Sequence, residues 1–150
     1  MGKNRRLWLS IALIAIGGMI YMLFRPRTLL LFVAADAIGL GHAVDSLRAI
    51  CLAQVLPDFA VYCLPNGLWA LAYVVLIDWV MQAYALRTRL LTASFIPLLG
   101  AASELAQAFG WLPGTYDAGD MWCYLLPWIG YALAETFHSS DSRHHGSLVE

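Results

Sequence analysis

One long apolar run near the start of the chain limits what the protein can fold into. Residues 7–24 are almost entirely apolar, and cations stand on both sides of the run, at Arg5 and Arg6 before it and at Arg25 after it. A helix of this length rises about 27 Å, which nearly spans the roughly 30 Å hydrocarbon core of a bilayer. The run ends on Arg25 without a small-residue cleavage site, so we expect an uncleaved membrane anchor rather than a signal peptide.

The overall composition also favours lipid as the solvent. Of the 150 residues, 61% are hydrophobic and only 13% are charged, whereas soluble domains are roughly a quarter charged. A soluble domain of this size could not bury so much apolar surface, because small domains expose a large fraction of theirs. The formal net charge of -1 and the lack of a basic tract in the sequence exclude a nucleic-acid-binding protein.

Three further stretches predict membrane-spanning helices, at residues 68–85, 90–109 and 121–137. Each is predominantly apolar and close to the length that a bilayer requires. Pro97 is expected to kink the second of these stretches. A turn, Pro65-Asn66-Gly67, is expected to precede the first of them. Together with residues 7–24, the sequence therefore predicts four transmembrane helices.

The segment between the first two spans, residues 28–65, has a different character. Charged residues interrupt it at short intervals, so no uninterrupted span fits. Leu47, Ile50, Val55 and Leu56 lie roughly on one helical face, which indicates one or two amphipathic helices at the membrane interface. The alternative is an extra span that starts near Leu29.

These predictions define the fold class and the domain organisation. We expect an all-α integral membrane protein with one transmembrane domain over residues 1–137, consisting of four spans and the interfacial segment. A polar, frayed C-terminal tail is expected at residues 138–150.

The distribution of cations predicts how the four spans are oriented. Four spans place the N-terminus, the loop after the second span and the tail on one side, and that side has six cations against three: Lys3, Arg5, Arg6, Arg87, Arg89 and Arg143 against Arg25, Arg27 and Arg48. Because cytoplasmic loops are enriched in Lys and Arg, both termini are expected in the cytoplasm. Residues 28–65 and the turn at residues 110–119 then face outward.

A group of acidic and amide side chains falls at the predicted outward end of the third and fourth spans. Glu104 and Gln107 are three residues apart and therefore share one helix face. A Gly/Pro turn then brings Asp117 and Asp120, again three residues apart, back towards them. Because ionisable side chains in an apolar chain are expensive, we predict that these four residues form a shared ligand-binding pocket.

Each of these four residues also has a purely structural interpretation. Glu104 can be a neutral acid that is hydrogen-bonded across helices, and Gln107 can bond a neighbouring backbone group. Asp120 can be the N-cap of the fourth span, and Asp117 can cap the same turn or form an Asx-turn. Capping explains one aspartate better than two, and it does not explain Glu104.

The same residues resemble a family motif. An E-x-x-Q at Glu104 and Gln107, a glycine turn, a D-x-x-D at Asp117 and Asp120, and a following Gly130-Tyr131 pair resemble the VanZ-like family of small bacterial membrane proteins. The resemblance covers residues 98–131. It departs from the family pattern at Thr115, Tyr124 and Pro127, where Arg, Asn and Gly are common. It implies a divergent, envelope-associated, multi-pass protein of the bacterial inner membrane, and it implies no particular reaction.

Three functions are compatible with the acidic group. The group can bind a hard cation or a cationic lipid headgroup, and Glu104, Asp117 and Asp120 are then the expected ligands of Ca²⁺ or Mg²⁺. It can supply acid and base groups to an enzyme that acts on a lipid-linked envelope substrate, although no nucleophile motif accompanies it in the sequence. It can also hold together an accessory protein that docks another membrane protein. We favour binding or an accessory role over catalysis, and we expect no cofactor besides such a cation.

Three other ionisable residues are secondary candidates. Asp58 loosely matches the first polar segment of the VanZ-like family. Asp78 lies inside the second span, where a polar contact with another helix is the simplest explanation, and the predicted topology separates it from the acidic group. His42 is expected to be an interfacial histidine rather than a metal ligand.

The three cysteines offer no recognisable framework. Cys51, Cys63 and Cys123 form no CxxC pair and have no metal-ligand spacing. We expect small apolar packing residues, with a Cys51–Cys63 disulfide as the alternative.

Overall fold

The computed structural model describes residues 3–27, 30–51 and 56–146, and every regular element within these ranges is an α-helix. The all-α prediction is confirmed for this part of the chain. The helices are α1 Lys3–Phe24, α2 Leu30–Ala37, α3 Gly41–Cys51, α4 Asp58–Tyr62, α5 Leu64–Val80, α6 Leu86–Ala93, α7 Phe95–Ala108 and α8 Ala118–Gly146.

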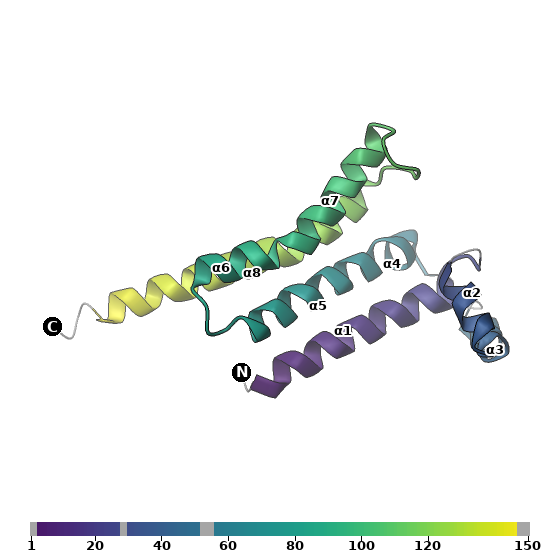
Figure 1. The fold of residues 1–150 in the computed structure, drawn as a ribbon, viewed down its shortest axis with the longest axis horizontal. Helices are drawn as coiled ribbons and strands as arrows, with labels where there is room; N and C mark the ends of the chain where they lie inside the picture. Colours follow the sequence, from purple (N-terminus) through teal and green to yellow (C-terminus); the bar gives the residue numbers. More distant parts are fainter. Residues whose placement is uncertain (1–2, 28–29, 52–55, 147–150) are drawn as a thin grey trace.

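The long helices lie side by side in alternating directions (Figure 1). Helix α5 packs between α1 and α8, and α7 packs on α8. The N-terminus, the α5–α6 turn and the C-terminal part of α8 lie at one end of this bundle, whereas α2, α3, α4 and the α7–α8 turn lie at the opposite end. The chain order thus brings the acidic α7–α8 turn to the same end as α4.

Helix α5 begins and ends earlier than the predicted span at residues 68–85. Pro65 and Asn66 lie in its first turn and are buried, so the predicted Pro65-Asn66-Gly67 turn is wrong. Proline is compatible with this position because the first N–H groups of a helix have no partner within the helix. Helix α5 ends at Val80, and a turn at residues 81–85 leads into α6.

The predicted span at residues 90–109 is divided into two helices. Helix α6 ends at Ala93, Ser94 interrupts the helix, and α7 begins at Phe95. Pro97 explains the break, because it has no N–H to donate to the carbonyl of Ala93 and its ring would collide with that carbonyl. The expected kink is therefore present, and it lies one turn before the proline itself.

Helix α8 is longer than the predicted span at residues 121–137. It starts at Ala118 and continues to Gly146, where the sequence predicts a frayed tail after Phe137. The polar C-terminal segment therefore extends the helix for more than two turns beyond the apolar part.

The segment between α1 and α5 is a series of short helices. Helices α2 and α3 have 8 and 11 residues and meet at Gly39, whose φ of +78° is a conformation that favours glycine. Neither helix is long enough to form the extra span that could have started near Leu29. Leu47 and Ile50 are exposed on α3, as expected for an amphipathic helix, whereas Val55 lies outside the described residues. Residues 58–62 form the short helix α4.

Two stretches are long and apolar enough to cross a membrane by length and composition. They are Asn4–Phe24 and Leu86–Ala108, and the latter contains the break at Ser94. Leu64–Val80 is a shorter apolar helix of 17 residues.

Candidate functional site

The acidic end of the molecule is organised by the start of α8. The Oδ1 atom of Asp117 accepts a hydrogen bond from the N–H of Gly119 at 2.7 Å, and the carbonyl of Asp117 accepts the N–H of Met121 at 3.1 Å. Asp117 therefore caps the helix. Asp120 lies one residue beyond Gly119, in the first turn, where the helix dipole favours a carboxylate. The alternative in which Asp120 is the N-cap is wrong.

Glu104 joins α7 to this helix start. It is 6% exposed, and its Oε2 atom accepts the backbone N–H of Asp117 at 3.2 Å. The bond links the far end of α7 to the residue that caps α8, so Glu104 holds the two helices in register. Gln107, one turn further along α7, lies against Gly114 within the α7–α8 turn.

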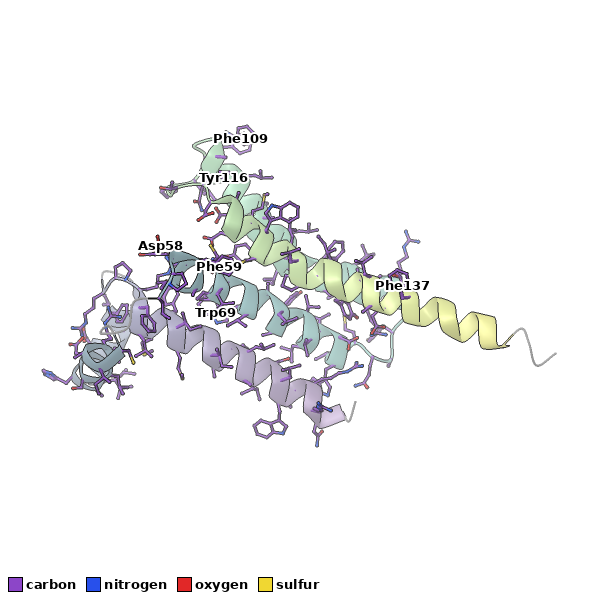
Figure 2. The ribbon with its side chains drawn as sticks, turned by 180° about the vertical axis from the view of Figure 1, so that it is seen from behind. Asp58, Phe59, Trp69, Phe109, Tyr116 and Phe137 are labelled. Carbon is purple, nitrogen blue, oxygen red and sulfur yellow. The ribbon has the colours of Figure 1, made fainter. Side chains whose placement is uncertain are left out.

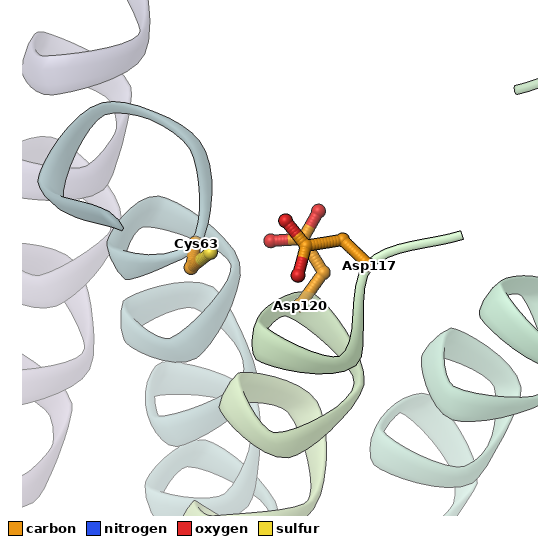
Figure 3. A group of neighbouring side chains, drawn as sticks. All are labelled: Cys63, Asp117 and Asp120. Atoms are coloured by element: carbon orange, nitrogen blue, oxygen red, sulfur yellow. The ribbon is translucent and has the colours of Figure 1, made fainter. Parts of the chain in front are cut away.

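Cys63 is the residue that the sequence analysis missed. It lies between α4 and α5, is 5% exposed, and points towards Asp117 and Asp120 (Figure 3). The Cys63 sulfur and one carboxylate oxygen from each aspartate all lie within 4.8 Å of one another. Gly119 permits this approach, because a Cβ atom there would lie 3.1 Å from the Cys63 sulfur.

The electrostatics of this group follow from burial and from like charge. Burial, followed by a hydrogen bond to Asp120 and by the charges of Asp120 and Asp117, raises the pKa of the Cys63 thiol to about 12. The thiol is therefore neutral at pH 7. The Oδ1 atom of Asp120 is buried and has no hydrogen-bond partner within the described part of the chain. All three cysteines are free thiols, so the alternative of a Cys51–Cys63 disulfide is not realised.

An open cavity of about 550 Å³ adjoins Cys63 and Asp117. Its lining combines carboxylates with aromatic rings: Asp58, Phe59, Tyr62, Cys63, Asp117 and Gly119. Figure 2 shows Asp58 and Phe59 at the same end of the molecule as Tyr116 of the α7–α8 turn. Asp58, a secondary candidate from the sequence, thus faces the same cavity as Asp117. We call this space the acidic pocket.

The carboxylates at the acidic pocket form no ion pair with a cation of the described residues. These carboxylates are Asp58, Glu104, Asp117 and Asp120. Arg25 reaches the pocket wall, but it donates to the carbonyl of Tyr62 at 3.2 Å and stacks on the Tyr62 ring, with its Cζ atom 4.7 Å from the ring centroid. The pocket is therefore a site of negative potential.

His42 lies at a cavity separate from the acidic pocket. It is exposed and lines a smaller cavity of about 250 Å³ between α2 and α3. Arg27 dominates that cavity, because it pairs with Asp36 at 2.6 Å and with Asp45 at 2.8 Å. His42 is not brought near Asp117 or Asp120.

Asp78 lies at the other end of the bundle, and both oxygens of its carboxylate are paired. It is 5% exposed and pairs with Arg6 of α1 and with Arg89 of α6. The hydroxyl of Tyr131 on α8 donates to it at 2.8 Å, and Arg89 also pairs with Glu135 at 3.2 Å. These contacts tie four helices together, which agrees with the structural interpretation of Asp78.

No family model, curated protein or solved structure matches the chain. The VanZ-like resemblance at residues 98–131 therefore stays a prediction. The residues that the structure brings together are Cys63, Asp117 and Asp120, with Glu104 and Asp58 beside them.

Proposed function

We propose that the protein is a small multi-pass membrane protein that binds a cation, or a ligand with a cationic group, in the acidic pocket. The observation that carries this proposal is the convergence of Asp58 and Asp117 on an open cavity, with Asp120 beside Asp117 and without a pairing cation among the described residues. The role is that of a binding or accessory protein of the cell envelope, as the VanZ-like resemblance implies.

Exposed apolar surface supports a membrane location. Trp8, Ile14 and Met19 on α1 are 67%, 50% and 61% exposed. Ile14 lies about 120° around the helix from Trp8, so more than one face of α1 is exposed. The chain exposes 9975 Å², whereas a compact soluble protein of 16.6 kDa exposes about 7,600 Å². Lipid tails around the bundle would cover this surface, because a helix that is apolar on all sides is stable only when it is buried.

The proposed topology has four crossings. Helix α1, helix α5, the broken pair α6–α7, and the apolar part of α8 cross the membrane in turn. The 17 residues of α5 rise about 26 Å, slightly less than the hydrocarbon core, so that Cys63 and α4 lie at the interface. The cation distribution then orients both termini to the cytoplasm of a bacterium and the acidic pocket to the outside.

Three features of the acidic pocket favour a cation as its ligand. Like charges around a low-dielectric cavity concentrate counter-ions. The ring of Phe59, which is 56% exposed at the pocket wall, offers a face for an organic ammonium group. The pocket also lies at the proposed membrane boundary, where an ammonium-bearing lipid headgroup and a soluble cation can both reach it.

Thermal unfolding of the detergent-purified chain tests this function. After EDTA treatment, we expect a higher Tm on addition of at least one of Ca²⁺, Mg²⁺, Zn²⁺ or ethanolammonium, because a ligand at 100 times its Kd stabilises the folded state by about 2.7 kcal/mol. Asp120→Asn should reduce the shift. Asp36→Asn, which changes an exposed aspartate outside the acidic pocket, should leave it unchanged. The absence of a shift with every cation would refute the proposal, and turnover of a lipid-linked substrate would favour the enzyme instead.

A further inference from the structure

We infer that Cys63, Asp117 and Asp120 hold a divalent metal ion of intermediate softness, for which Zn²⁺ is the best match, at the wall of the acidic pocket. This inference rests on the proposed cation-binding function and names the ion. The metal ligands predicted from the sequence were Glu104, Asp117 and Asp120, so Cys63 takes the place of Glu104.

The first support is the geometry of the three ligand atoms. They come from two distant segments, the α4–α5 junction and the start of α8, and lie within 4.8 Å of one another. Zinc binds sulfur at about 2.3 Å and carboxylate oxygen at about 2.0–2.2 Å, so two ligands of a tetrahedral ion lie about 3.5 Å apart. The three ligand atoms would have to approach one another by up to about 1.3 Å to complete the site.

The second support is the state of the two aspartates. The buried Oδ1 atom of Asp120 has no hydrogen-bond partner among the described residues, and an unsatisfied buried acceptor normally has a compensating partner. A metal ion beside it would supply that partner. Asp117 uses Oδ1 to accept the Gly119 N–H, which orients its carboxylate and leaves the second oxygen for an ion.

The third support is the chemistry of the ligand set. Calcium takes six to eight oxygen ligands, and magnesium keeps an octahedral shell of oxygens and waters. One sulfur and two carboxylates suit zinc better than either ion. When the metal binds, the Cys63 thiol gives up its proton to solvent and the thiolate becomes the ligand. Three protein ligands would leave a fourth position of a tetrahedral ion for water or another ligand.

The test measures metal binding by the full chain in detergent. After EDTA treatment, we expect one Zn²⁺ per chain in equilibrium dialysis. Cys63→Ala should weaken Zn²⁺ binding at least about 100-fold, because loss of a supporting partner alone weakens metal sites 10- to 100-fold. Cys51→Ala, which removes a half-buried cysteine on α3, is the matched control and should bind Zn²⁺ like the unmodified chain.

A spectroscopic measurement on the unmodified, folded chain shows directly whether a thiolate binds the metal. Co²⁺ in place of Zn²⁺ should show a thiolate-to-cobalt charge-transfer band in the unmodified chain and in Cys51→Ala, but not in Cys63→Ala. Equal zinc binding by both cysteine variants would overturn the inference. Stabilisation by Ca²⁺, Mg²⁺ or ethanolammonium without Zn²⁺ binding would overturn it while the proposed function stands. No response to any of these cations would refute both.

Discussion

The two ends of the helical bundle both gather ionisable side chains, but they balance charge in opposite ways. At the end near the N-terminus, Asp78 and Glu135 meet Arg6 and Arg89, and the charges cancel. At the other end, carboxylates gather around the acidic pocket without an ion pair in the described part of the chain. Burial also differs between the ends: Asp78 is 5% exposed and Glu104 is 6% exposed, whereas Asp58 and Asp117 are exposed and Asp120 is half-buried.

A structural acid and a candidate ligand differ in whether the oxygens of the carboxylate are already paired. A buried carboxylate whose oxygens are taken by arginines and a tyrosine has no capacity left for a ligand, and it stabilises helix contacts instead. A carboxylate such as Asp120, with a buried oxygen that has no hydrogen-bond partner among the residues the structure describes, retains that capacity. The pairing of each oxygen is therefore more informative than the position of an acid in an apolar helix.

The largest expected difference between the ends is the side of the membrane that each faces. In a chain without its native cysteines, Thr115→Cys in the α7–α8 turn should react with an impermeant thiol reagent added to intact cells. Thr88→Cys, on α6 at the other end, should react only after the membrane is opened. The reverse pattern would overturn the proposed orientation.

Removing the acid of the balanced end should destabilise the protein strongly. Asp78→Ala leaves Arg89 with Glu135 alone, and because loss of one member of a buried ion pair costs about 3–5 kcal/mol, the free energy of unfolding should fall by up to about that amount. Tyr131→Phe, which removes one hydrogen bond to the same carboxylate, should lower it by about 1 kcal/mol. Reversible unfolding in detergent measures both. Equal values for the two variants would mean that the arginines contribute little.

A smaller effect is expected at Glu104, the buried acid that joins α7 to the start of α8 at the acidic end. Glu104→Leu removes the acceptor for the Asp117 N–H, and the loss of such a hydrogen bond should lower the free energy of unfolding by about 0.5–1.5 kcal/mol. Glu104→Gln keeps a side-chain oxygen as acceptor and should retain most of the stability in the same unfolding measurement. If Glu104→Gln is as unstable as Glu104→Leu, the charge of Glu104 matters more than its hydrogen bond.

The helices could be predicted because their signals are local. Apolar runs and prolines mark α1, α5 and the kink between α6 and α7. The boundaries were less accurate where one residue type is compatible with two structures. Pro65 suits a turn and also the first turn of a helix, and only the packing of α5 decides between them.

The site could be predicted only in part, because its members come from separate segments. Asp117 and Asp120 are close in sequence, and the hairpin of α7 and α8 makes their proximity to Glu104 predictable. Cys63 meets them only because α5 packs on α8, and the spacing of residues in the sequence does not predict that contact. Glu135 was missed for the same reason, since its partner Arg89 lies on α6.

The length of α8 has a consequence for the cytoplasmic side of the proposed topology. Its 29 residues rise about 43 Å, and the hydrocarbon core accounts for about 30 Å of that length. With Asp117 at the outer boundary, about 13 Å of helix would project into the cytoplasm as a rigid stalk. The end of this stalk would stand clear of the lipid headgroups, where a soluble protein can reach it from all sides.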